Sequence, residues 1–207
     1  MIIRHDEIKE VLRDIASQAF KPSAVRDEPR INPCRTAEQK KAQEQLNTPV
    51  TRNLHKNDGE KRGDVSIRGL WTRGTDCIID VRVTDTDAKS NLSKDPAKVL
   101  EAHEREKKKK YLEACLAQRR HFTPFVVSAD GLLGKEAKTL LKKLSTLLAA
   151  KWGKLYSEVC GYVNARMSIA IVRATHLCLR GSRIPTSQMS TRQPQWEDKA
   201  GLSLFRH

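Results

Sequence analysis

Long apolar segments and aromatic side chains are both scarce in this sequence. Only 5% of its 207 residues are aromatic, and no run approaches the roughly 18 consecutive apolar residues of a membrane-spanning helix. The first residues, MIIRHDEIKE, carry charges where a secretory signal peptide has an unbroken apolar run. We therefore expect an intracellular protein without a membrane partner.

Cysteine is also too scarce and too scattered to build a disulfide framework. The five cysteines are odd in number and show no paired spacing, unlike those of small secreted domains held by disulfides. Cys160, His176 and Cys178 lack the fourth ligand and the pair spacing of a zinc site. A reducing compartment fits this pattern better than secretion.

Positive charge, by contrast, is abundant. Lys and Arg together number 39 against 25 Asp and Glu, which gives a formal net charge of +14. An excess of this size is typical of proteins that bind a polyanion. We expect DNA as the partner, the nucleus as the location, and no small-molecule cofactor.

The length and the distribution of apolar residues predict one domain with two irregular segments. Residues 32–59 have almost no apolar periodicity and predict a flexible loop, and residues 181–207 predict a loose basic C-terminal tail. Residues 1–31 and 60–180 remain for a single folded domain, since a chain of this length usually forms one core.

The elements of this domain follow from spacing. Helical periodicity predicts a helix over residues 5–20, and an extended stretch follows at 24–31. Two runs rich in Val and Ile, 64–70 and 76–84, flank a plausible turn and predict an antiparallel hairpin. Later segments predict a helix at 97–120, a buried strand at 121–128, and helices at 135–152 and 157–180, the last packed on several sides. The fold class is therefore α/β, with a small mixed sheet flanked by helices.

A candidate site lies in the second strand of the hairpin. Alternation sends Asp80 and Arg82 to one face of this strand, while Asp64 opens the preceding strand and can approach Asp80. Two carboxylates beside a cation suit Mg²⁺, which prefers oxygen ligands and keeps several waters. Such an ion would activate a water for attack on a phosphodiester. The alternative is an ion pair on an exposed strand face, which contributes little to stability.

These residues resemble the PD-(D/E)xK signature of the restriction-endonuclease-like superfamily. Arg-Gly-Asp at 62–64 is followed by Asp-Val-Arg at 80–82, and the element order matches the αβββαβ core of that superfamily. More narrowly, RGLWTRGTDCIIDVRVTDTDAKS, EREKKKKYLEAC and HFTPFVVSADGLLGKEA are similar to the C-terminal region of reverse-transcriptase reading frames in non-LTR retrotransposons. The likeness covers roughly residues 1–31 and 60–200. It implies a Mg²⁺- or Mn²⁺-dependent endonuclease that nicks target DNA, with RNA as a second partner within a retroelement particle.

Two positions depart from the signature. Gly63 precedes Asp64 where the pattern has Pro, a tolerated change. Arg82 stands where the pattern has Lys, and Arg is a poor proton donor or acceptor because it stays protonated at physiological pH. In the retrotransposon branch the working lysine is thought to come from the following helix, and helical geometry centres Lys108 on the stripe of Tyr111, Leu112, Cys115 and Leu116.

The resemblance also implies further ligands and a DNA surface. Superfamily members use an additional Glu as a metal ligand, for which Glu28 is the first candidate and Glu10 the second. The catalytic set is then Asp64, Asp80, Arg82 and Lys108, and the metal ligands are Asp64, Asp80 and Glu28. We expect DNA to contact Arg62, Lys107, Lys110, Arg119 and Arg120, although a lysine run is often only a solvated helix face.

Two further hypotheses compete with the nuclease. The same fold could be a catalytically inactive, basic nucleic-acid-binding remnant, because Arg82 replaces the expected lysine. A structural or assembly piece that touches no nucleic acid is the third reading. The sequence is too short for a complete reverse transcriptase, which excludes polymerase activity within this chain.

Overall fold

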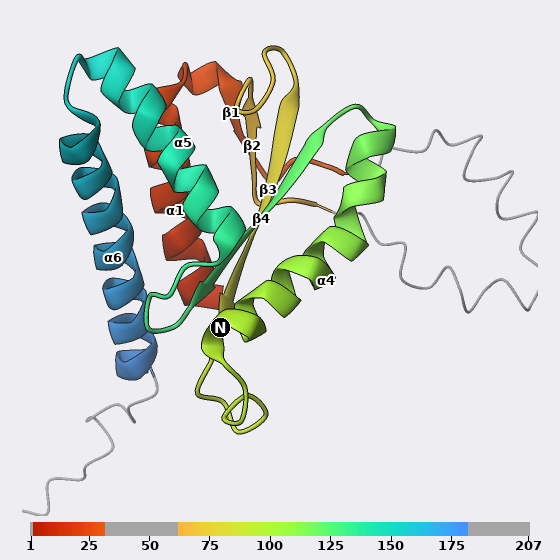
Figure 1. Ribbon diagram of the computed structural model, residues 1–207, viewed down its shortest axis with the longest axis vertical. Helices are drawn as coiled ribbons and strands as arrows, with labels where there is room; N and C mark the ends of the chain where they lie inside the picture. Colours follow the sequence, from red (N-terminus) through yellow and green to blue (C-terminus); the bar gives the residue numbers. More distant parts are fainter. Residues whose placement is uncertain (1, 32–61, 182–207) are drawn as a thin grey trace, which may run out of the picture.

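The computed structural model describes residues 2–31 and 62–181. The predicted loop at 32–59 lies outside the described residues, as does the predicted tail, except for Gly181, which ends the last helix. Figure 1 shows a small sheet with helices on both faces. In chain order the elements are α1 Ile2–Ala19, η1 Pro22–Ala24, β1 Val25–Asp27, β2 Val65–Arg68, β3 Asp76–Thr84, α4 Pro96–Ala117, β4 His121–Ser128, α5 Lys135–Trp152 and α6 Tyr156–Gly181.

The four strands form one mixed sheet in the order β1-β2-β3-β4. The predicted hairpin is confirmed, since β2 pairs antiparallel with β3 and Val65 lies opposite Ile79. β4 runs parallel to β3 along its length. A parallel neighbour needs a crossover connection, and α4 supplies it. The chain is therefore a mixed α/β protein with a small four-stranded sheet flanked by helices, as the sequence predicted.

Local sequence signals set the ends of the helices. The carboxylate of Asp95 accepts a hydrogen bond from Ala97 N at 2.9 Å, and Pro96 occupies the first turn, where its missing N–H costs nothing. Gly153 ends α5 in the left-handed conformation at φ 63°, which glycine adopts without steric cost. These signals fix where the crossover helix starts and where α5 turns into α6.

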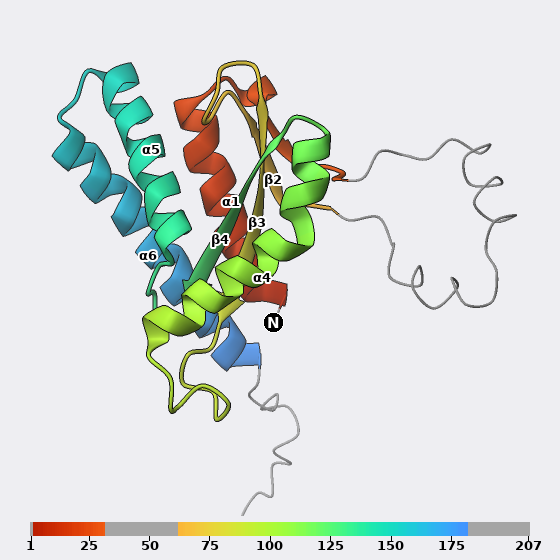
Figure 2. The same cartoon turned by 45° about the vertical axis from the view of Figure 1, so that its right-hand side comes forward.

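The two faces of the sheet are covered differently, as the turned view in Figure 2 also shows. On one face α1, α5 and α6 enclose a large apolar core that includes Leu12, Val81, Phe125 and Leu144. On the other face α4 packs over a smaller cluster of Ile31, Ile78, Tyr111, Cys115 and Phe122. Polar side chains of β3 are left facing α4, and this arrangement positions the candidate site.

α6 differs from its prediction. It packs through one stripe, in which Val163, Met167 and Ala170 are buried, whereas Ile169 is 59% exposed and Val172 is 69% exposed. Its neighbours in the described structure are α1 and α5. The prediction of a helix packed on several sides was wrong, because apolar residues on the outer face do not prove that a partner covers them. No helix in the described ranges is long and apolar enough to cross a bilayer.

Candidate active site

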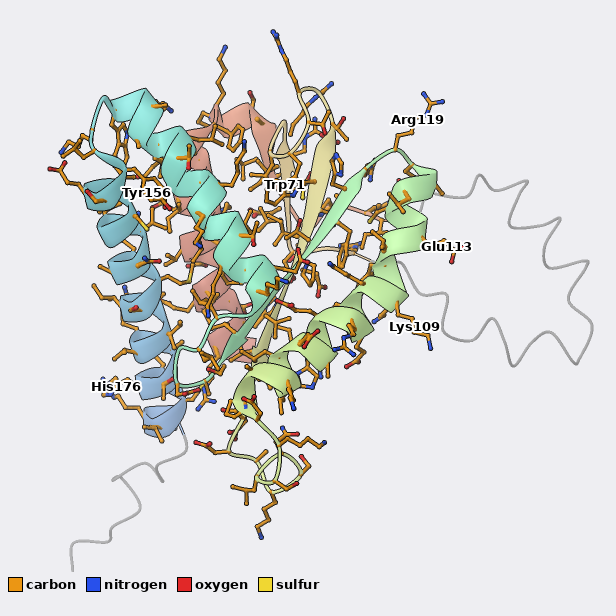
Figure 3. All side chains as sticks on the ribbon, viewed as in Figure 1. Trp71, Lys109, Glu113, Arg119, Tyr156 and His176 are labelled. Carbon is orange, nitrogen blue, oxygen red and sulfur yellow. The ribbon has the colours of Figure 1, made fainter. Side chains whose placement is uncertain are left out.

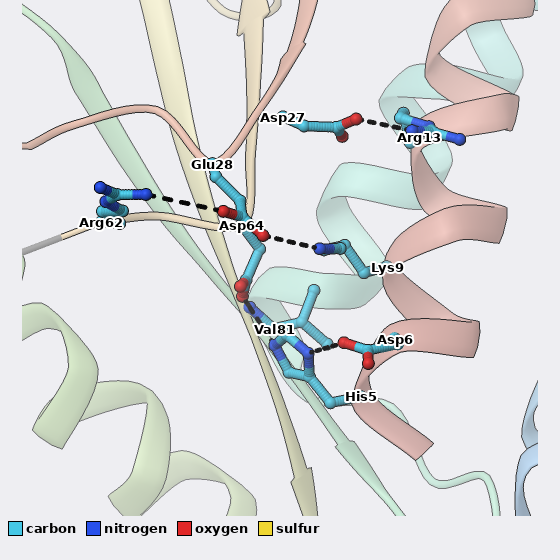
Figure 4. A network of polar contacts seen from close by, with 9 residues as sticks. All are labelled: His5, Asp6, Lys9, Arg13, Asp27, Glu28, Arg62, Asp64 and Val81. Atoms are coloured by element: carbon cyan, nitrogen blue, oxygen red, sulfur yellow. Dashed lines mark hydrogen bonds and ion pairs between the residues drawn. The ribbon is translucent and has the colours of Figure 1, made fainter. Parts of the chain in front are cut away.

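Asp64 directly precedes β2, at the end of the sheet where that strand begins. Its backbone N–H donates to Ile79 O at 2.9 Å. Its carboxylate Oδ2 accepts a hydrogen bond from Val81 N at 2.6 Å and lies 3.0 Å from His5 Nε2 of α1 (Figure 4). The pairing of β2 with β3 ends at Val65 and Ile79. The Asp64 side chain therefore accepts the hydrogen bond of the Val81 amide, which has no partner residue on β2.

Gly63 allows the approach of Asp64 to β3. A Cβ at Gly63 would collide with the Ile78 side chain and come within 3.3 Å of Ile79 O. The chain passes so close to β3 that any side chain would push it away. The glycine before Asp64 is therefore explained by packing.

Asp80 is a buried carboxylate on the face of β3 that α4 covers. It is only 5% exposed, and its Oδ2 forms an ion pair with Lys107 of α4. Burial raises the pKa of Asp80 above its usual value, the negative charge of Asp64 adds to the rise, and the Lys107 ammonium opposes it. The hydrogen bond from Val81 N to Asp64 Oδ2 brings the Asp64 carboxylate to the β3 backbone next to Asp80, as the hairpin register predicted.

Each carboxylate has a cation from a different helix. His5 is held between Asp64 and Asp6, and the hydrogen bond to Asp64 is the main reason that its pKa rises to about 9. His5 is consequently protonated at neutral pH. The site thus joins α1, the start of β2, β3 and α4, with the two negative charges balanced by His5 and Lys107.

Arg82 faces α4 as predicted, on the same side of β3 as Asp80. Its guanidinium donates to Glu106 Oε2 at 2.7 Å, and this hydrogen bond is the main reason that the pKa of Glu106 is lowered. Two residues after Arg82 on the same face of β3, Thr84 Oγ1 lies 2.8 Å from His103 Nδ1. A ladder of polar contacts therefore links β3 to α4.

The lysine that α4 brings to Asp80 is Lys107, which differs from the prediction of Lys108. Lys108 instead lies 2.5 Å from Glu136 Oε1 at the start of α5. The prediction placed Leu116 in the buried stripe of this helix, but Leu116 is 57% exposed. The stripe runs through Leu100, Glu104, Tyr111 and Cys115, and the two lysines flank it on opposite sides.

Neither predicted third ligand joins the two carboxylates by a contact. The Glu28 carboxylate lies 3.4 Å from Lys9 Nζ and 3.8 Å from Arg62 Nη1 (Figure 4), although the Glu28 backbone N–H donates to Asp64 O. Glu10 is exposed on α1. Glu28 therefore stands next to Asp64 along the sheet and engages two other cations.

The remaining predicted DNA contacts separate into two places. Lys110 lies beside Lys107, with its Nζ 4.8 Å from the centre of the Tyr111 ring. At the far end of α4, Arg120 donates to Arg30 O at 2.9 Å, and Arg119 extends away from the domain (Figure 3). Only Lys110 is close to the ladder between β3 and α4.

The donor set fits a divalent ion that takes two carboxylates. Mg²⁺ is commonly bound through one or two carboxylates while it keeps several waters, and Asp64 and Asp80 provide such a pair. Within residues 2–31 and 62–181 no three His, Cys, Asp or Glu side chains form a group that could hold a metal. His5 and Lys107 contact the same oxygens that an ion would take, so binding requires these cations to move aside.

His5 and Glu106 are the residues that sequence reasoning missed. His5 shares a helical stripe with Ile8 and Leu12, both buried against the sheet, so the same periodicity that predicted α1 also points His5 inward. Glu106 gave no such signal, because an exposed Glu in a charged helix is ordinary.

No protein-family model matches the chain, and no curated protein matches it either.

Proposed function

We propose that the chain is a divalent-metal-dependent DNA endonuclease module with a restriction-endonuclease-like core, of the kind carried at the C-terminal end of non-LTR retrotransposon reading frames. The observation that carries the proposal is the approach of Asp64, which directly precedes β2, to the β3 backbone beside Asp80, with Lys107 of the following helix on Asp80. The order and pairing of the strands support the same fold type.

The residues divide the chemistry between them. Asp64 and Asp80 would hold the ion, which when bound supplies Lewis-acid assistance to phosphodiester hydrolysis. Lys107 would donate hydrogen bonds to the reacting phosphate or water, in the place that Arg82 cannot fill as a proton carrier. Arg82 and Lys110 would then bind phosphate oxygens, since guanidinium and ammonium groups stabilise the anionic transition state.

A nicking assay tests this proposal. Supercoiled plasmid is incubated with the protein in Mg²⁺, in Mn²⁺ or in EDTA, alongside Asp64→Asn and Asp80→Asn. Asp130→Asn is the matched control, since Asp130 is exposed in the turn after β4. We expect nicking only with a divalent ion, lost in both site variants and kept in the control. Nicking in EDTA, or nicking at the wild-type rate by either site variant, would overturn the proposal.

The second candidate is a DNA-binding module without catalysis. The observation that favours it is that Asp64, Asp80 and Arg82 are each paired within the protein, with His5, Lys107 and Glu106 respectively. The net charge of +14 would still give salt-sensitive DNA affinity. Tight binding with no cleavage in either ion, by protein of normal stability, supports this candidate.

A further inference from the structure

Two connected grooves extend from the candidate site along the first half of α4. The first, of about 520 Å³, is bordered by Arg82, Lys107 and Lys110 together with His103 and Asn91. The second, of about 400 Å³, shares His103 and Asn91 with the first and continues to Lys94 and Lys98. Both fall in the range of about 300–1,000 Å³ that is usual for sites of small ligands. They form one path between α4 and the segment that follows β3.

Cations border this path at both of its ends. Arg82, Lys107 and Lys110 stand at the end next to Asp80, and Lys94 and Lys98 stand at the other end. Three acids also border it, but Asp95 caps α4 and Glu106 is bonded to Arg82. The walls carry five cations against three acids. Arg82 is paired with Glu106 and Lys107 with Asp80, so Lys94, Lys98 and Lys110 are the cations outside these two ion pairs.

His103 lies at the junction of the two grooves. Burial lowers the pKa of His103, and the positive charges of Arg82 and Lys94 lower it further. Glu106 acts in the opposite direction. Thr84 Oγ1 lies 2.8 Å from His103 Nδ1 and holds the imidazole ring between the two groups of cations, where an aromatic ring can contact a sugar or a base next to the phosphates.

The two arginines just beyond the C-terminal end of α4 are placed differently. Arg120 donates to the carbonyl of Arg30 and so binds the protein itself. Arg119 points outward from the turn before β4 (Figure 3). Neither arginine borders either of the two grooves.

We infer that one strand of the DNA substrate runs from Asp80 and Lys107 through both grooves to Lys94 and Lys98, and leaves Arg119 and Arg120 outside its path. The position of the cleaved phosphodiester on this DNA strand rests on the proposed function. The binding path does not rest on it, because cations bind phosphates whether or not a phosphodiester is cleaved.

Equilibrium binding distinguishes the two ends of α4. Anisotropy of a fluorescently labelled short DNA duplex is measured in EDTA, over a range of salt, with three double variants that each remove two positive charges. Lys94→Gln with Lys98→Gln tests the grooves, and Arg119→Gln with Arg120→Gln tests the far end. Lys143→Gln with Lys154→Gln, on α5 and in the turn that follows it, controls for net charge, because α5 packs against the opposite face of the sheet and neither lysine borders the two grooves.

We expect the groove variant to weaken binding about five- to ten-fold and to reduce the magnitude of the salt slope by about 2, since each lysine neutralises about one phosphate. The α5 and far-end variants should each change affinity by less than about two-fold. Equal losses in all three, or a larger loss in the far-end variant, would overturn the inferred path.

Failure of the path and failure of the nuclease give different results. If wild-type protein does not nick plasmid but the groove variant alone weakens binding, the path stands and the second candidate function is favoured. If nicking requires Mg²⁺, Asp64 and Asp80 while the groove variant binds as wild type, the path is wrong and the nuclease proposal stands.

Discussion

The two faces of the sheet use the same strands for different purposes. On the side of α1, α5 and α6, β3 and β4 contribute Ile79, Val81, Phe125 and Val127 to an apolar core. On the side of α4, β3 contributes Asp80, Arg82 and Thr84, each in contact with a charged or polar residue of that helix. The comparison indicates that one face supplies the free energy of folding and leaves the other free to hold charges.

Matched phenylalanines on β4 test this division most strongly. Phe125 and Phe122 lie on opposite faces, with Phe125 in the large core and Phe122 in the small cluster under α4. Phe125→Ala should lower the free energy of unfolding by about 3–5 kcal/mol, because a fully buried ring leaves a cavity. Phe122→Ala should cost less, since Phe122 is 7% exposed at the edge of a small cluster. Urea unfolding measures both, and equal losses would contradict the division.

Lysine variants of α4 sharpen the comparison within the charged face. Lys107→Gln should reduce Mg²⁺-dependent nicking about 100-fold, the size of effect seen when one transition-state donor is removed. Lys108→Gln breaks only the contact with Glu136 and should leave nicking within about two-fold, with a small effect on stability.

Lys109→Gln is the control for this pair, since Lys109 is exposed and extends away from the domain (Figure 3). A greater loss of nicking in the Lys108 variant than in the Lys107 variant would restore the assignment made from the sequence.

The contact between α4 and the start of α5 at Glu104 gives a third prediction, with a smaller expected effect. This buried carboxylate of α4 accepts a hydrogen bond from Glu136 N at 2.9 Å and so caps α5. A Cβ at Gly134 would collide with Glu104 Oε1. Gly134→Ala should therefore destabilise the protein by about 1–3 kcal/mol in urea unfolding.

Gly161→Ala is the matched glycine control, because a Cβ there meets open space within α6. It should be neutral or stabilising by up to about 1 kcal/mol. A neutral Gly134→Ala would show that α4 and α5 can separate without cost.

The smallest expected effect concerns His5. Its pKa rises from 6.5 to about 9 in the folded protein, so its contribution to stability is complete below pH 6.5 and is lost as the pH rises through about 9. In EDTA, the free-energy difference between wild type and His5→Gln should therefore shrink over this interval. A difference that is constant with pH would show that His5 does not bind Asp64 as an imidazolium.

Most of the fold was accessible from the sequence because its signals are local. β4 spans His121–Ser128 and α5 spans Lys135–Trp152, as alternation and helical period predicted. The exposed face of α6 could not be predicted from the sequence, because it depends on which elements pack against the helix. Apolar residues on several sides of a helix do not show how many elements pack against it.

The candidate site was only partly accessible for the same reason. Asp64, Asp80 and Arg82 follow from strand alternation and hairpin register, which operate over a few residues. The choice between Lys107 and Lys108 depends on a rotation of α4 by one residue, and that rotation is set by tertiary packing of Tyr111 and Cys115. The predicted stripe included the exposed Leu116 and left out the buried Leu100 and Glu104, and together these errors shifted the helix face.

Binding of Mn²⁺ to metal-free protein, followed by electron paramagnetic resonance of the free ion, tests the central claim most directly. The account predicts one bound ion per chain in wild-type protein, lost in Asp64→Asn and equally in Asp80→Asn, with Asp130→Asn unchanged. Absence of bound Mn²⁺ in folded wild-type protein, or binding that survives in either single variant, would contradict a site shared by the two carboxylates.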